Sequence, residues 1–188
     1  MDKFDPATVF SSIDQQGRYA YGNQPAIAQW NLARLAECLL PLLNSDSSVA
    51  IKMAEEVIQG FRETFQKEYY QGLGYKLGLK TSQPDDFKLF ESLFQYMKQG
   101  QLDYTKTFTS LTRGESILPD WQKQWQQRIL AENGEMNASL LIMKMHNPQI
   151  IPRNYWVEEA LKQANENSDL SLLKELVEAL QTPFDVPV

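Results

Sequence analysis

The sequence predicts an all-α protein: an irregular multi-helix bundle of about eight helices that follows an irregular N-terminal segment. Three observations support this. From residue 23 onward, apolar residues recur every three or four positions. Valine and isoleucine are sparse, and no Asn-Gly turn joins two alternating runs, so no strand or hairpin is expected. No fixed repeat period is present, which argues against a solenoid.

The first 22 residues have no sustained periodicity and mix four aromatic residues with polar ones. Such a stretch cannot bury itself and needs a surface from elsewhere. We therefore divide the chain into an irregular segment, residues 1–22, and a helical domain, residues 23–188. On its own, the segment is expected to be disordered or to mediate self-association.

The helical domain is expected to open with two long helices. The first begins at the N-cap Asn23 and carries a leucine face as far as Leu43, with Pro41 kinking or ending it. The second follows Asp46, continues to about Tyr75 and ends near Gly78. Glycine is the preferred residue just beyond a helix end.

Six shorter helices are expected after Gly78. Ser82 starts the third helix with capping-box spacing to an aspartate, and Ser168 caps the last one. The expected ranges are 82–100, 103–111, 119–134, 137–145, 153–165 and 168–181.

Composition narrows the function. The 188 residues are 43% hydrophobic and 22% charged, which suits one globular domain with a core. The net charge of −6 argues against a nucleic-acid partner. No stretch reaches the roughly 18 apolar residues of a membrane span, and no signal peptide opens the chain, so we expect a cytoplasmic protein without membrane contact. Cys38 lies in an apolar helical run, which predicts a buried, inert thiol.

Most chemically suggestive residues have a structural interpretation. The glycines between Gly72 and Gly78 follow a helix and have the wrong spacing for a phosphate loop. His146 is the single histidine, so a histidine-rich metal site is excluded and a role at a helix C-terminus is favoured. Trp121 and Trp125, four residues apart, are typical of a packing seam.

Two runs resemble a known family. Gly17 to Ala36 reads GRYAYGNQPAIAQWNLARLA, and Asn147 to Tyr155 reads NPQIIPRNY, similar to an NPxxxxRNY element. Both resemble the SelO/YdiU family, kinase-like proteins that transfer AMP from ATP to Ser, Thr or Tyr hydroxyls of proteins. The order and separation of the runs also fit, so the resemblance covers nearly the whole chain.

The resemblance implies a division of labour. In that family the ATP-binding lysine, the catalytic acid and the magnesium ligands lie upstream of the first run. The chain is then expected to be the C-terminal helical part of such a protein, a scaffold without cofactor of its own and inactive alone. Its partners would be the upstream kinase-like half, which takes ATP and Mg²⁺, and the protein substrates. The alternative is an independent helical interaction module without enzymatic activity, and whether Met1 is the natural start stays open.

The resemblance also singles out candidate residues, none of them assigned to catalysis, cofactor binding or metal binding. Functionally, Arg18 could brace a loop of the active site or reach a phosphate; structurally, it and Arg153 could tie irregular backbone to the bundle, which we favour. Arg34 lies off the leucine face and is expected to pair with an acidic neighbour. The full set is Arg18, Asn23, Trp30, Arg34, Asn147, Arg153 and Asn154. Many members carry a cysteine where this chain has Phe10, and a cysteine or selenocysteine at their C-terminal end. This sequence contains neither, so redox control by those residues is unsupported here.

Overall fold

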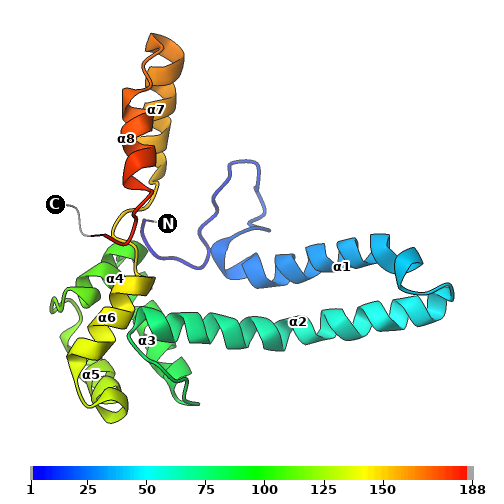
Figure 1. Ribbon diagram of the computed structural model, residues 1–188, viewed down its shortest axis with the longest axis horizontal. Helices are drawn as coiled ribbons and strands as arrows, with labels where there is room; N and C mark the ends of the chain where they lie inside the picture. Colours follow the sequence, from blue (N-terminus) through cyan, green and yellow to red (C-terminus); the bar gives the residue numbers. More distant parts are fainter. Residues whose placement is uncertain (1, 186–188) are drawn as a thin grey trace. The chain divides into compact units, whose positions relative to one another are not determined.

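The computed structural model describes residues 2–185, apart from the side chain of Asn133; the open question about Met1 lies outside this range. Within it the chain forms eight α-helices and one short 3-10 helix, and no sheet (Figure 1). The predicted all-α fold class is thus confirmed. The helices are η1 (Tyr21–Asn23), α1 (Gln24–Leu43), α2 (Ser47–Lys76), α3 (Asp86–Gln99), α4 (Tyr104–Thr112), α5 (Pro119–Asn133), α6 (Met136–His146), α7 (Asn154–Asn167) and α8 (Ser171–Ala179).

The chain divides into two compact units. Residues 5–71 form the first, called here the hairpin unit. Residues 2–4 and 72–185 form the second, called the C-terminal unit. The long helix α2 contributes to both. The separate domain boundary predicted at residue 23 concerns the intact protein and stays a prediction.

The hairpin unit consists of a loop followed by α1 and the larger part of α2. The carboxylate of Asp46 accepts hydrogen bonds from the amides of Ser48 (2.8 Å) and Val49 (3.3 Å), so it caps the start of α2. The helix α1 continues two residues beyond Pro41. None of its residues is buried. Cys38 is exposed, so the prediction of a buried thiol is wrong, because nothing in the hairpin unit covers that side of α1.

The core of the C-terminal unit is built around two tryptophans of α5. Trp121 and Trp125 are fully buried, and their rings stack with centroids 5.9 Å apart. Their indole N–H groups donate to the carbonyls of Leu89 (3.0 Å) and Leu77 (2.9 Å). The predicted packing role of this pair is confirmed. Other fully buried members of this core are Leu79, Leu93, Met97, Phe108, Leu111, Ile129 and Met143.

Phe4 places the beginning of the chain on this unit. Its ring stacks with Phe94 (4.9 Å) and Tyr104 (5.9 Å), and its N–H donates to the carbonyl of Leu102 (2.8 Å). It is therefore buried, whereas Phe10 of the hairpin unit is exposed. The bundle thus supplies a surface for one aromatic residue of the irregular segment.

Two predicted helix caps are wrong. The helix α3 begins at Asp86 rather than at Ser82, and the Asp86 carboxylate accepts from the Gln83 amide (2.7 Å). Ser168 ends α7 in a left-handed conformation, with φ of 53°, and α8 begins only at Ser171. In both places a nearby carboxylate, rather than the predicted serine hydroxyl, accepts the hydrogen bond from the backbone amide. At the start of α8 this carboxylate is that of Asp169, which accepts from the Ser171 amide.

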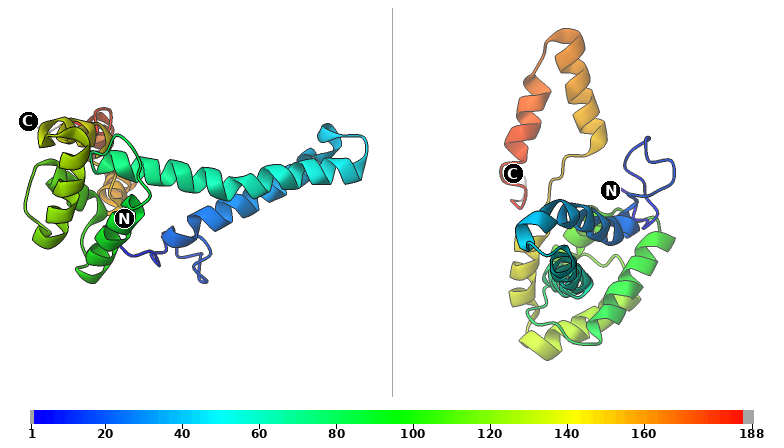
Figure 2. Two further views of the ribbon diagram at one scale, coloured as in Figure 1. Left: turned by 90° about the horizontal axis from the view of Figure 1, so that it is seen from below. Right: turned by 90° about the vertical axis from the view of Figure 1, so that its right-hand side faces the viewer.

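The last two helices, α7 and α8, lie side by side in antiparallel orientation (Figure 2). Across residues 2–185, none of the helices combines the length and the apolar character that crossing a bilayer requires.

Candidate functional site

In the hairpin unit, three of the residues singled out above come together around Trp30. The guanidinium of Arg18 lies 4.3 Å from the centroid of the indole ring, and that of Arg34 lies 5.4 Å from it. Arg34 also pairs with Glu37 at 2.5 Å, one turn further along α1. Trp30 is 46% exposed, so the cluster is a surface cation–π arrangement.

The loop that brings Arg18 to this cluster is held by local hydrogen bonds. The Asp14 carboxylate accepts from the amides of Arg18 and Tyr19, both at 2.8 Å. The side-chain amide of Asn23 donates to the carbonyl of Gly17 (2.9 Å). Asn23 occupies the N-cap position of α1, but its side chain makes no capping hydrogen bond to the helix. It fixes the preceding loop instead.

In the C-terminal unit, Arg153 joins three segments of the chain. Its guanidinium binds both carboxylate oxygens of Asp103, at 2.7 and 3.1 Å, and also pairs with Asp2. Asp103 is the N-cap of α4 and accepts from the Lys106 amide (2.8 Å). Burial raises the pKa of Asp103, but the hydrogen bonds from Arg153 and Lys106 outweigh it and hold that pKa below its usual value. An arginine with two parallel hydrogen bonds to a carboxylate is suited to holding irregular backbone against a helix end, and this role of Arg153 stays a prediction.

Asn147 connects the ends of three helices. It is fully buried, and its side-chain amide donates to the carbonyl of Lys76 (2.8 Å), the last residue of α2, and to the hydroxyl of Thr112 (3.0 Å), the last residue of α4. Its own backbone forms the C-cap of α6. The side-chain oxygen Oδ1 of Asn147 has no hydrogen-bond partner among residues 2–185. Asn154, by contrast, is exposed in the first turn of α7.

Lys76 completes a reciprocal arrangement with α6. Its ammonium donates to the carbonyl of His146 (3.0 Å), the last residue of α6, while Asn147 caps the carbonyl of Lys76. The ammonium also lies over the rings of Phe108 (5.0 Å) and Tyr104 (5.8 Å). Burial lowers the pKa of Lys76 to about 8.

This lowered pKa predicts a pH-dependent stability. The unfolded chain binds a proton at Lys76 that the folded chain has released between about pH 8 and the ordinary pKa of 10.5, so stability rises with pH in that window. In urea unfolding, the free energy of unfolding of the wild type minus that of Lys76→Met should increase by about 2 kcal/mol from pH 8 to pH 10. An exposed-site control, Lys123→Met, should show no such trend. A flat difference for Lys76→Met would contradict the lowered pKa.

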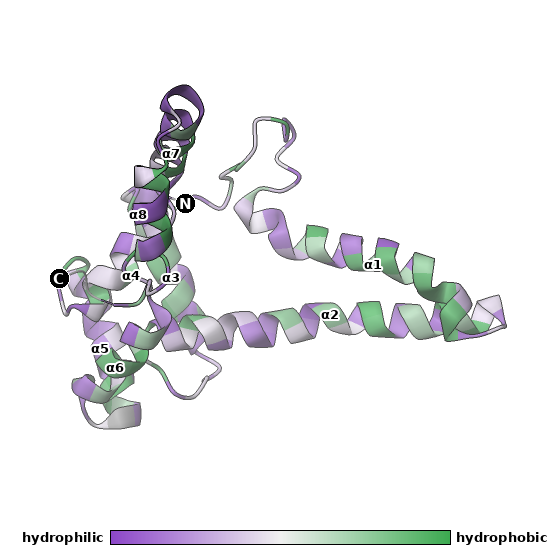
Figure 3. Cartoon of the chain, turned by 45° about the horizontal axis from the view of Figure 1, so that its top comes forward, coloured by the Kyte–Doolittle hydropathy of each residue, from purple (hydrophilic) through white to green (hydrophobic). Residues whose placement is uncertain are grey.

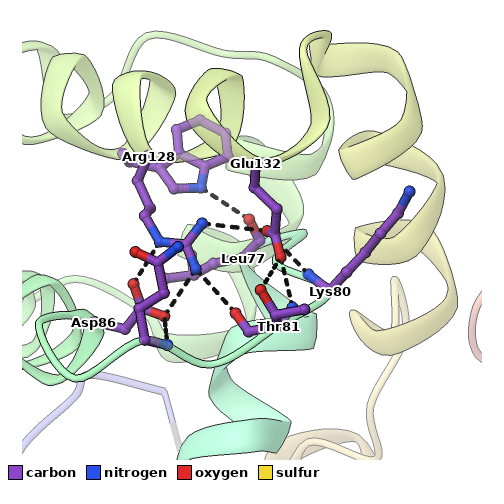
Figure 4. A network of polar contacts seen from close by, with 8 residues as sticks. Leu77, Lys80, Thr81, Asp86, Arg128 and Glu132 are labelled. Carbon is purple, nitrogen blue, oxygen red and sulfur yellow. Dashed lines mark hydrogen bonds and ion pairs between the residues drawn. The ribbon is translucent and has the colours of Figure 1, made fainter.

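A third polar cluster connects the loop before α3 to α5 (Figure 4). Arg128 binds the buried carboxylate of Asp86 through Nε (2.7 Å) and Nη2 (3.1 Å), and it donates to the carbonyl of Thr81 (2.9 Å). Glu132 accepts from the amides of Lys80 (3.2 Å) and Thr81 (2.6 Å). Burial raises the pKa of Glu132, but hydrogen bonds from Thr81 outweigh it, so that pKa lies below its usual value. Arg128 and Glu132 thus bind backbone groups of the loop before α3 and hold this loop against α5.

The expected pairing of Arg34 with an acidic neighbour is confirmed by Glu37, but sequence reasoning missed the partners of Asn147 and Arg153. Lys76 closes a long periodic helix, and Asp103 stands directly before another; both positions are signals for side chains at helix ends. Nothing local indicates that they meet Asn147 and Arg153. Among the described residues, no group of three or more His, Cys, Asp or Glu side chains is placed to hold a metal ion.

Comparisons with known proteins give a consistent result. Residues 1–118 match the family model described as "Protein adenylyltransferase SelO". The chain is 48% identical to the protein nucleotidyltransferase YdiU of Anoxybacillus flavithermus, covering 98% of this chain and 39% of that protein. The YdiU proteins of Shouchella clausii and Clostridium botulinum are 44% and 43% identical, with 98% of this chain and 40% of each relative covered. The chain thus spans about two-fifths of the length of these relatives.

Proposed function

The chain belongs to the SelO family, and from this we propose that it is the non-catalytic, helical C-terminal scaffold of a YdiU-type protein nucleotidyltransferase. The intact protein would transfer AMP from ATP to Ser, Thr or Tyr hydroxyls of protein substrates. The kinase-like half of the polypeptide would be the partner of this chain and would hold ATP and Mg²⁺. We place the protein in the cytoplasm, where a free cysteine such as Cys38 stays reduced.

The observation that carries this proposal is the set of contacts made by the polar residues of the two runs that resemble the family. Arg153 is bound to two carboxylates, and Asn147 binds the ends of two helices. Arg18 and Arg34 lie against an indole ring. The contacts of Arg153 and Asn147 hold backbone and helix ends within the C-terminal unit, and the contact of Arg18 joins a loop to α1 within the hairpin unit. They support a scaffold in which the second family-like run closes the bundle.

The described residues do not fit an ATP–magnesium site. Transfer of a nucleotidyl group requires a metal clamp on the phosphates and cations placed for the developing charge. Asp103 and Asp86 are paired with Arg153 and Arg128, and the described residues contain no group of three or more His, Cys, Asp or Glu side chains placed to hold a metal ion. We therefore derive no catalytic step from this chain.

Calorimetric titration tests the proposal. The isolated chain is expected to give no saturable heat with ATP and Mg²⁺ at micromolar concentrations and to transfer no AMP to a protein substrate. The YdiU nucleotidyltransferase of Anoxybacillus flavithermus, titrated under the same conditions, is the positive control, which checks that ATP binding would be detected. Saturable binding to the isolated chain with a defined stoichiometry would contradict a non-catalytic role.

The alternative, an independent helical interaction module, makes a different prediction. Such a module would be complete without a kinase-like half and would gain no stability from one. The chimera described in the next subsection separates the two, because only the scaffold proposal requires that this chain replace the matching part of a relative.

A further inference from the structure

The helix α1 carries an uncovered row of leucines. Leu32, Leu35, Leu39 and Leu42, called here the leucine stripe, are spaced by three, four and three residues. At 100° per residue they fall within an arc of about 80°, on one face of the helix. Their exposed fractions are 40%, 54%, 40% and 81%. Figure 3 shows hydrophobic residues on successive turns of α1.

A second apolar face of α1 points in a different direction. Ala33, Ala36 and Leu40 line a groove of about 570 Å³ whose other wall includes Ile51, Ala54 and Ile58 of α2. This face lies about 110° around the helix from the leucine stripe. The helix therefore has one apolar face toward α2 and another that the rest of the hairpin unit leaves exposed. A helix that is apolar over so wide an arc is typical of a protein interior.

The residues beside the stripe show what kind of surface would cover it. In a two-stranded coiled coil, the positions that flank the apolar row are often charged and pair across the dimer. Here those positions are Asn31, Ala36, Cys38 and Leu43, none of which is charged. Three of the four are apolar, so the stripe has no charged rim. This favours burial in a large protein body over pairing with a second copy of α1.

The part of the relatives that this chain does not match is large enough to be that protein body. This chain covers 39% and 40% of two of them, so about three-fifths of each relative lies outside the matched segment. We propose that the leucine stripe is the docking surface for this remaining part of the polypeptide, the kinase-like half of the proposed function, on which this inference rests. Docking removes the four leucine side chains from water and turns α1 into an internal helix.

The test compares one substitution in two contexts. In the first, Leu35→Glu is made in the isolated chain. In the second, it is made in a chimera in which this chain replaces the matching segment of the Anoxybacillus flavithermus YdiU protein, to which it is 48% identical. The matched control is Leu141→Glu in α6, since Leu141 is 63% exposed.

We expect Leu35→Glu to leave the melting temperature of the isolated chain unchanged, because the site is exposed there. In the chimera it should lower the melting temperature by roughly 5 °C or more, because an unpaired carboxylate would be buried. Leu141→Glu should have little effect in either context. Amide hydrogen exchange across α1 should also slow at least tenfold in the chimera relative to the isolated chain.

Each contrary result has its own meaning. An equal effect of Leu35→Glu in both contexts, in a chimera that folds and transfers AMP, would overturn the docking surface and leave the proposed function standing. A chimera that fails to fold even with the unsubstituted chain would count against both. If light scattering shows the isolated chain to be a dimer that Leu35→Glu makes monomeric, and the chimera is unaffected, a second copy covers the stripe and our proposal is wrong.

Discussion

Replacing Gly78 with alanine is expected to lower the free energy of unfolding by about 3 kcal/mol, because two costs combine at this position. Gly78 follows the end of α2 with φ of +77°, a conformation that residues with a side chain adopt only at a cost. A Cβ atom there would lie 2.7 Å from the carbonyl oxygen and 2.8 Å from the Cβ of Ser139, which is fully buried in α6. The close approach of α2 and α6 therefore depends on the missing side chain.

A matched control separates the two costs. Gly134, at the C-terminal end of α5, has nearly the same φ of +71°, but a Cβ there would have no neighbour within 4 Å. Gly134→Ala should therefore lose only the conformational part, about 1 kcal/mol. Urea unfolding followed by the fluorescence of the buried tryptophans measures both. Equal losses for the two variants would show that Ser139 moves aside at little cost.

The second large effect is expected at Arg128. Arg128→Met leaves the carboxylate of Asp86, whose side chain is 4% exposed, without its cation, and should cost about 3 kcal/mol. Adding Asp86→Asn to this variant removes the uncompensated charge and should restore part of the loss. The asparagine can still accept from the Gln83 amide, the bond that begins α3.

The control for Arg128 is an exposed ion pair. In Arg34–Glu37 the two side chains are 51% and 53% exposed, so Arg34→Met should cost less than about 0.5 kcal/mol. Both variants can be compared by urea unfolding at pH 7. If Arg128→Met costs no more than Arg34→Met, the Asp86 carboxylate is better solvated than its burial indicates.

The helices were predictable where one local pattern decides them. Trp121 and Trp125 are four residues apart on an amphipathic helix, and this spacing alone placed them in the core. The serine caps failed at Ser82 and Ser168 because several oxygen-bearing side chains lie within three residues of each start. The sequence does not show which of these side chains accepts the hydrogen bond from the helix amide, because that depends on the path of the backbone.

The contacts of the candidate residues were beyond local patterns for another reason. The hydrogen bond from Asn147 to Lys76 joins residues 71 positions apart, and that from Arg153 to Asp103 joins residues 50 apart. Family resemblance picked out one member of each pair and gave no information on the other. Cys38 was misjudged for the same reason, since covering α1 depends on a surface distant in sequence.

The reciprocal contact between Lys76 and Asn147 also bears on how the chain acquires its structure during synthesis. The C-terminal end of α2 receives its cap from a residue made 71 positions later. At ordinary translation rates of about 5–20 residues per second, Lys76 precedes Asn147 by roughly 4–14 s. Over that interval the carbonyl of Lys76 lacks this partner, so the end of α2 can fray there. The contact that joins the ends of α2, α4 and α6 therefore forms only after Asn147, in the second family-like run, has been made.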